Sequence, residues 1–188
     1  NPRSVRFNPD GTKMYVVGRD GVPSAGIAAC NINEYALSTA WDITTATYTD
    51  LFSCLAQDTA ISDMQFNADG TLLLVLGDTG NDVNEYDLAT AYDVSTATFV
   101  DSFSIGAQET SPAGLGFNVD GTRMYIAGTD GDDVIQYPLV TGFDVSGGKI
   151  KGVRTSRGDI KTKKIGLCVA GSTNILAEKL NITLPVET

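Results

Sequence analysis

The chain contains no histidine among its 188 residues. Without an imidazole it offers no Ser-His-Asp or Cys-His catalytic arrangement, no histidine-held zinc and no histidine general base. Carboxylate chemistry, such as that of glycoside hydrolysis, remains available to it. The sequence shows no catalytic or cofactor-binding site, and we expect the protein not to be an enzyme.

Cysteine is scarce, with three residues at Cys30, Cys54 and Cys168. An odd number gives no complete disulfide framework, and no C-x-x-C spacing occurs. Cys30 and Cys54 fall near the ends of adjacent predicted strands, so a disulfide between them is one prediction. It would close a loop of about 25 residues and contribute roughly 3 kcal/mol. Three reduced thiols are the alternative, and the sequence leaves both open.

Long apolar runs are also missing. The longest, Leu72 to Leu76, has five residues, whereas a membrane-spanning helix needs about 20. We therefore expect no membrane span. Clustered Lys and Arg, which binding to phosphates requires, are absent from the first 148 residues, so we do not expect nucleic acid as a partner.

Charge divides the chain into two parts. Residues 1–148 carry 5 basic and 20 acidic side chains, a net charge of −15, whereas residues 149–188 carry 8 basic and 3 acidic ones, a net charge of +5. A change this abrupt usually marks a change of domain or of role. We therefore separate a body, residues 1–148, from a basic C-terminal extension, residues 149–188.

The body consists of three copies of one repeat. The copies occupy approximately residues 1–56, 57–107 and 108–148. One half of the repeat reads SVRFNPDGTKMYVVG (4–18), DMQFNADGTLLLVLG (63–77) and LGFNVDGTRMYIAG (115–128). The other half reads NEYALSTAWDITTAT (33–47), NEYDLATAYDVSTAT (84–98) and IQYPLVTGFDVSGG (135–148). The period is about 51 residues, and repeat one holds eight extra residues within 21–30.

Each repeat is typical of four short antiparallel strands. The D-G-T sequence supplies the hydrogen bonding and the positive φ that a hairpin turn needs. The second strand is apolar throughout, as in Leu72 to Leu76, which indicates that both of its faces are covered. The third alternates, with Tyr86 and Leu88 on one side and Glu85 and Asp87 on the other. The repeat therefore predicts an all-β fold.

The F-x-x-DGT-x-M-Y-V-x-G unit and the T-A-aromatic-D-V-S-T-A-T unit resemble β-propeller repeats of secreted bacterial proteins and of virion proteins of bacterial viruses. The resemblance implies β-propeller-like blades of four antiparallel strands, and an extracellular or virion location. Three blades do not close a ring, because propellers typically use four to eight. An uncovered blade would expose an apolar face and a free sheet edge, so we expect self-association into a larger assembly.

The basic extension has two interpretations. It could complete the third blade, with Lys149 to Thr155 as a fourth strand, or it could act as an assembly arm that docks on an acidic neighbour. The arm residues would be Lys161, Lys163, Lys164, Leu180, Ile182 and Leu184.

Acidic side chains recur in two settings. Asp42, Asp93 and Asp144 occur once per repeat and are expected to accept backbone hydrogen bonds in a turn. Two acidic loops are weak calcium candidates, because clustered oxygen ligands around glycine can hold Ca²⁺. Their residues are Asp78, Asp82, Asp130, Asp132 and Asp133.

Together these features predict a non-enzymatic building block of an extracellular assembly, such as a virion or a surface filament. Its subunits would be joined through blade faces and the basic arm. The alternative is a propeller adhesin that binds a glycan or a host receptor through loops on one face.

Overall fold

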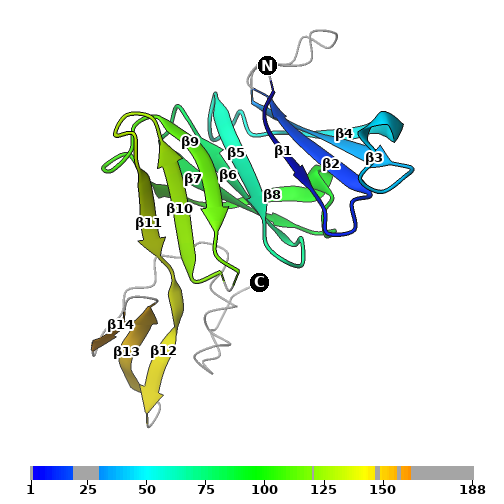
Figure 1. The fold of residues 1–188 in the computed structure, drawn as a ribbon. Helices are drawn as coiled ribbons and strands as arrows, with labels where there is room; N and C mark the ends of the chain where they lie inside the picture. The colour runs from blue at the N-terminus through cyan, green and yellow to red at the C-terminus, as the bar shows by residue number, and fades with distance from the viewer. Residues whose placement is uncertain (1, 19–29, 120, 147–148, 156–157, 162–188) are drawn as a thin grey trace. The chain divides into compact units, whose positions relative to one another are not determined.

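The computed structural model describes residues 2–18, 30–119, 121–146, 149–155 and 158–161, and it is built almost wholly of β-strands (Figure 1). The elements are β1 (Pro2–Phe7), β2 (Lys13–Gly18), β3 (Asn31–Leu37), η1 (Ile43–Thr45), β4 (Ala46–Ser53), β5 (Ile61–Phe66), β6 (Leu72–Gly77), β7 (Asp82–Leu88), η2 (Val94–Thr96), β8 (Ala97–Ser104), β9 (Pro112–Phe117), β10 (Arg123–Gly128), β11 (Val134–Pro138), β12 (Val140–Ser146), β13 (Lys149–Thr155) and β14 (Gly158–Lys161). The two η elements are short 3₁₀ turns. No helix among the described residues is long and apolar enough to cross a membrane.

The strands form four antiparallel sheets. Blade one has the order β1-β2-β3-β4 and blade two the order β5-β6-β7-β8, while the other two sheets are β11-β10-β9 and β12-β13-β14. The all-β fold with four antiparallel strands in a blade is thus confirmed for the first two repeats. By its contacts the chain forms two compact units, residues 1–115 with 126–135, and residues 116–125 with 136–188.

The repeated D-G-T sequence makes the predicted hairpin turn. In blade one the Asp10 carboxylate accepts hydrogen bonds from the Thr12 amide (2.9 Å) and the Thr12 hydroxyl (2.6 Å), and Gly11 has a φ of 72°. A side chain at Gly11 would collide with the Trp41 ring, because its Cβ would lie 2.3 Å from the nearest ring atom. Glycine is required here both for its φ and for the ring packed above it.

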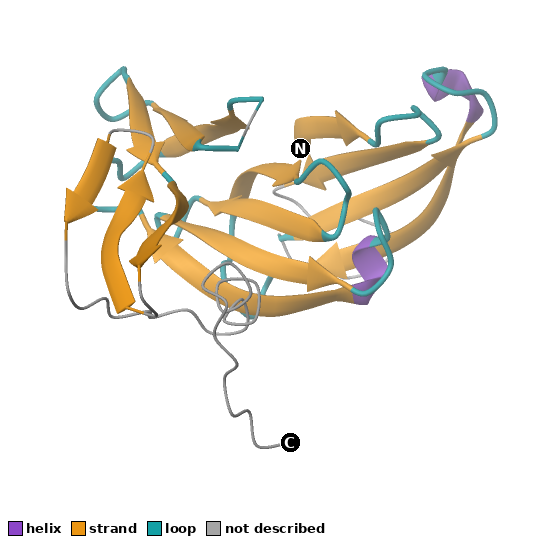
Figure 2. Cartoon of the chain, turned by 90° about the horizontal axis from the view of Figure 1, so that it is seen from below, coloured by secondary structure: helices purple, strands orange, loops and turns teal. Residues whose placement is uncertain are grey.

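The expected role of the repeated aspartate is confirmed in the first two blades. Asp42 and Asp93 are the N-caps of η1 and η2, and they accept from the amides of Thr44 (3.0 Å) and Ser95 (3.1 Å). These turns lie at the same end of their sheets (Figure 2).

For Asp144 the same prediction is wrong, because this residue lies within β12, opposite Gly152. Residues 140–145 read V-T-G-F-D-V, and alternating β-branched and aromatic residues favour a strand over a 3₁₀ turn. Among its described residues, repeat three therefore shows neither the 3₁₀ turn nor the fourth strand of the other two. Lys149–Thr155 is a strand, but it pairs with β12 and β14.

The core lies between the first two blades. It contains Tyr15, Val17 and Ile32 from blade one and Met64, Leu73 and Val75 from blade two, all with side chains that are completely buried. Because successive residues of a strand point to opposite faces, these residues define one face of each sheet. The strand β5 packs beside β1 and β2, and the turn η2 packs beside β4.

A buried carboxylate joins three inner strands. Asp63 of β5 forms an ion pair with Arg6 of β1 (2.6 Å) and accepts hydrogen bonds from the Ser4 hydroxyl (2.5 Å) and the Leu115 amide of β9 (2.9 Å). Only 5% of Asp63 is exposed. Burial of a charge is tolerated when it is paired and hydrogen-bonded, so Asp63 is a structural anchor between the blades.

Candidate ligand-binding cleft

A cleft of about 250 Å³ opens between blades one and two, where the turns after β1 and β5 face each other. Each blade contributes an equivalent set of residues from its F-N-x sequence and its 3₁₀ turn. The lining residues are Arg6, Phe7, Asn8, Pro9 and Trp41 of blade one, and Gln65, Phe66, Asn67, Ala68 and Tyr92 of blade two. The cleft is thus a product of the repeat and of the contact between two blades.

Four aromatic rings line this cleft in two pairs. The ring centroids of Phe7 and Trp41 lie 5.3 Å apart with planes inclined by 40°, and those of Phe66 and Tyr92 lie 5.4 Å apart with planes inclined by 63°. Trp41 is 59% exposed, although large apolar rings usually lose more of their surface on folding. The cleft therefore presents accessible aromatic surface to a ligand.

Trp41 and Tyr92 both have a left-handed backbone, with φ of 66° and 57°. This conformation costs a bulky residue about 1 to 3 kcal/mol. It is held by hydrogen bonds from the Trp41 amide to the Gly11 carbonyl and from the Tyr92 amide to the Gly70 carbonyl, both 2.9 Å. The strained turn fixes the place of each ring over the neighbouring glycine.

Most polar groups of the cleft already have partners within a blade or between the two blades. The Asn8 side chain accepts from the Lys13 amide (2.8 Å), and Arg6 is paired with Asp63 and donates to the Gln65 side-chain oxygen (3.2 Å). The Tyr92 hydroxyl donates to the Ala68 carbonyl (2.8 Å), and burial raises the pKa of Tyr92, with Asp69 and Asp10 adding to it. No carboxylate is among the lining residues, so the cleft offers stacking surface and neutral polar groups rather than an acid–base pair.

The weak calcium candidates lie at two places in the fold. Asp78 and Asp82 lie in the β6–β7 turn and at the first residue of β7, and Asp130, Asp132 and Asp133 lie in the β10–β11 turn. In the first, burial raises the pKa of Asp82, and the neighbouring Asp58 adds to this, while the Asn84 amide donates to Asp82 at 2.7 Å. In the second, Asp130 accepts from the Thr110 hydroxyl at 2.5 Å. Across the part of the chain that the structure describes, no three acidic or cysteine side chains come close enough to share a metal ion. Calcium binding at Asp78, Asp82, Asp130, Asp132 and Asp133 stays a prediction.

Cys30 and Cys54 are brought together as the sequence predicted, as buried free thiols. The Cys54 amide donates to the Cys30 carbonyl at 2.9 Å. A hydrogen bond between the two thiols, followed by burial, raises the pKa of Cys54. Of the predicted arm residues, Lys161 is an exposed residue of β14, whereas Lys163, Lys164, Leu180, Ile182 and Leu184 lie outside the described residues, as does Cys168.

Sequence reasoning missed the cleft. The sequence does contain the aromatic residues that form it, Phe7 and Phe66 at one repeat position and Trp41 and Tyr92 at another. Aromatic residues at these positions are equally expected in the core of a blade, so they do not indicate a cleft. Only the packing of one blade on the next turns them into the walls of one cleft.

Comparison with known proteins places the fold among β-propellers. Similar structures include a protein assigned as a 6-phosphogluconolactonase from Bacteroides fragilis (16% identity, TM-score 0.54, covering 87% of this chain and 40% of that one). A periplasmic gluconolactonase from Pseudomonas aeruginosa matches with 18% identity and a TM-score of 0.51, over 91% of this chain and 43% of that one. The β-propeller domain of Cps50 (Swd1) from Myceliophthora thermophila matches with 9% identity and a TM-score of 0.51, over 73% and 40% of the two chains. The chain thus spans less than half of each of these propellers.

Among curated sequences, the β subunits of sarcosine oxidase from Arthrobacter and from Rhodobacter capsulatus are 44% and 42% identical over 57 residues. These 57 residues are 30% of this chain and 14% of each relative. No known family profile matches the chain.

These comparisons overturn two sequence-based predictions. A non-enzymatic building block of a virion or filament, with an adhesin as the alternative, was expected, but the similar propellers include a gluconolactonase and a protein assigned as a phosphogluconolactonase, and the similar sequences belong to an oxidase. The prediction that the protein is not an enzyme is wrong for the same reason. The absence of histidine misled us, because it excludes only the kinds of catalysis that use an imidazole.

Proposed function

We propose that this chain is part of a propeller enzyme of the lactonase type, and that the cleft between blades one and two binds the ring of a neutral sugar lactone. The observation that carries the proposal is the exposed Trp41 ring, held by a strained backbone at the rim of an aromatic cleft. The lactonase names of the similar propellers supply the substrate class.

The size and chemistry of the cleft suit one small ring. Pockets for drug-sized ligands usually have volumes of about 300 to 1,000 Å³, and about 250 Å³ lies just below that range. A sugar lactone has apolar C–H faces and polar edges. Aromatic rings such as Trp41 and Phe7 can pack on those faces, while the few polar groups orient the edges.

The charge of the cleft favours a neutral ligand. Its one cationic lining residue is Arg6, and the guanidinium already forms two hydrogen bonds to Asp63, at 2.7 and 2.6 Å. A phosphorylated ligand would have to compete with this buried carboxylate. We therefore place the unphosphorylated lactone ahead of its 6-phosphate.

The groups that would activate water lie outside this cleft, because no carboxylate lines it. In a complete propeller they would come from other blades, and the chain spans about two fifths of the lactonase-type propellers it resembles. The sarcosine oxidase matches support an enzymatic setting but carry no information on this substrate. The finer resemblance to secreted bacterial repeats remains a prediction.

The single tryptophan makes the proposal directly testable. Trp41 is the only tryptophan of the chain, so its fluorescence reports on the cleft alone. Titration of the 188-residue chain with D-glucono-1,5-lactam, a hydrolysis-resistant ring analogue, should change the emission saturably, with a dissociation constant of about 1 mM or below.

Calorimetry of Trp41→Ala should show loss of binding. The control is Tyr48→Ala, which also removes an exposed aromatic ring, 49% accessible, but one that lies outside the cleft. Lactam binding that survives Trp41→Ala, or that is absent from the wild-type chain, would contradict the proposal.

A further inference from the structure

Blade one and blade two carry the same apolar face, but only one of these faces is covered. In blade two the face consists of Met64, Leu73 and Val75 with the turn residue Val94, all completely buried. The equivalent residues of blade one, at the same positions of the repeat, are Val5, Met14, Val16 and Ile43. We call these four residues the acceptor face of blade one.

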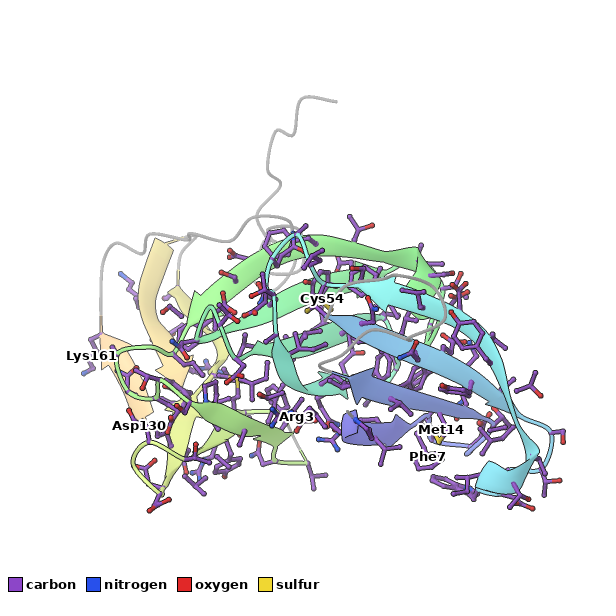
Figure 3. The ribbon with its side chains drawn as sticks, turned by 90° about the horizontal axis from the view of Figure 1, so that it is seen from above. Arg3, Phe7, Met14, Cys54, Asp130 and Lys161 are labelled. Atoms are coloured by element: carbon purple, nitrogen blue, oxygen red, sulfur yellow. The ribbon has the colours of Figure 1, made fainter. Side chains whose placement is uncertain are left out.

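The acceptor face of blade one is open. Val5 is 48% exposed and Ile43 is 61% exposed, and Met14 and Val16 are only partly buried. Met14 and its neighbour Phe7 lie on this sheet (Figure 3). An exposed apolar surface of this kind typically marks an interaction site.

The equivalent face of blade two, which blade one covers, shows which contacts such a face makes. Blade one meets the turn η2 of blade two with a polar cluster, Lys13, Tyr15 and Glu34. The Tyr92 carbonyl accepts from the Tyr15 hydroxyl (2.6 Å) and from the Lys13 ammonium (2.8 Å). The Val94 amide donates to the Glu34 carboxylate (3.1 Å), which also pairs with Lys13 at 2.7 Å. Burial, with the Glu34 charge adding to it, raises the pKa of Tyr15 and keeps its hydroxyl a donor.

The turn η1 of blade one is built in the same way as η2. Trp41 and Tyr92 share a left-handed φ, Asp42 and Asp93 share the N-cap, and the C-caps Ala46 and Ala97 have ψ of 129° and 131°. The Trp41 carbonyl and the Ile43 amide therefore stand where the Tyr92 carbonyl and the Val94 amide stand in blade two. Among the described residues, no Lys, Tyr and Glu cluster meets them.

We propose that the acceptor face of blade one receives a further blade of the same repeat, one that precedes it in the complete polypeptide. That blade presents an apolar face with a tyrosine or lysine donor to the Trp41 carbonyl and a carboxylate to the Ile43 amide. Two observations point to this occupant: the identical contact one blade further on, and the similar propellers, of which this chain spans 40 to 43%. A second copy of the chain is less suited, because the faces that could cover the acceptor face are already buried in its first two blades. In blade one this is the face of Tyr15, Val17 and Ile32, and in blade two the face of Leu76 and Val83.

The test adds the missing blade. A copy of residues 1–59 is fused ahead of Asn1, which reproduces the 59-residue spacing between Pro2 and Ile61. Trp41 of the added copy is changed to Tyr, as in blade two, so that the original Trp41 remains the single fluorophore. Hydrogen exchange of the Ile43 amide should then slow by about two orders of magnitude, because local opening is needed to expose a bonded amide.

Two variants show which contact slows the hydrogen exchange of the Ile43 amide. Glu34→Ala in the added copy alone should restore fast exchange at Ile43. Tyr48→Ala in the original chain should change nothing, because the equivalent Phe99 stays 43% exposed in the covered blade. If the first extension does not fold, an extension built from residues 60–110 repeats the test for the carboxylate alone. Its blade carries Glu85 at the position of Glu34, but Leu72 and Leu74 at the positions of Lys13 and Tyr15.

Fast exchange at Ile43 in both extended proteins would overturn the proposal. So would concentration-dependent dimerisation of the unextended chain that Val5→Glu abolishes, since the occupant would then be a second copy. Neither result depends on ligand binding in the cleft.

Discussion

Blade one and blade two have nearly the same sequence pattern and the same order of strands, but they differ in how many of their faces are covered. Blade two is packed against blade one, and its apolar residues Met64, Leu73 and Val75 are completely buried. In blade one the equivalent Val5 is half exposed. The same position of the repeat is therefore a core position in one copy and a surface position in the other. How much its side chain stabilises the protein depends on whether another blade covers it, and not on the repeat sequence.

The largest contrast is expected at one repeat position that holds Asp63 in blade two and Ser4 in blade one. Asp63→Ala removes the partner of Arg6 and leaves the amide of Leu115 without its acceptor, which should lower the free energy of unfolding by about 4 kcal/mol. Ser4→Ala removes one hydrogen bond and should cost about 1 kcal/mol. Urea unfolding measures both, and equal losses would contradict the role of Asp63 as an anchor.

The apolar faces give the next contrast. Leu73→Ala creates a cavity between two sheets and should lower the free energy of unfolding by about 3 kcal/mol. Met14→Ala, at the equivalent position of blade one, should cost about 1 kcal/mol, because this side chain is only partly buried. In the chain extended by an added blade, the cost of Met14→Ala should rise toward that of Leu73→Ala. An unchanged cost there would show that the face stays open.

Blade one carries a pair of thiols, Cys30 and Cys54, at positions where blade two has no cysteine. Cys30 and Cys54 occupy the positions that Asn81 and Ile105 hold in blade two, and both pairs share the same backbone hydrogen bond, at 2.9 and 2.8 Å. Oxidation by a low-molecular-weight disulfide such as oxidised glutathione should join the two sulfurs and release two equivalents of the reduced thiol. The bridge should raise the free energy of unfolding by about 2 to 3 kcal/mol. Mass spectrometry would show the loss of two hydrogens, and Cys54→Ala is the control that should show neither change.

Local patterns predicted the fold better than the site. Three local features each depend on a few adjacent residues, and all three formed as expected. They are the D-G-T turns of blades one and two, the turn aspartates Asp42 and Asp93, and the apolar strand predicted at Leu72 to Leu76, which is β6. Asp144 did not follow, because its neighbours Val140, Phe143 and Val145 favour a strand. The cleft could not be predicted from one repeat, since Phe7 and Phe66 belong to different blades and meet only through packing.

The smallest effect is expected where the two blades do not differ. In the D-G-T turns of blades one and two the hydroxyl and then the amide of the following threonine lower the pKa of the aspartate below 3.8, at Asp10 through Thr12 and at Asp69 through Thr71. A carboxyl whose pKa is lower in the folded state stabilises the protein above its unfolded pKa, and this contribution is lost as the pH falls through the folded pKa. Asp10→Asn and Asp69→Asn should therefore each make the stability fall less steeply below pH 4, and by similar small amounts, because both carboxylates are fully exposed. Unfolding followed between pH 2 and pH 6 measures this. Because the two carboxylates are equally exposed and each is bound by the threonine two residues on, a marked difference between the two variants would show that the blades differ in more than their coverage.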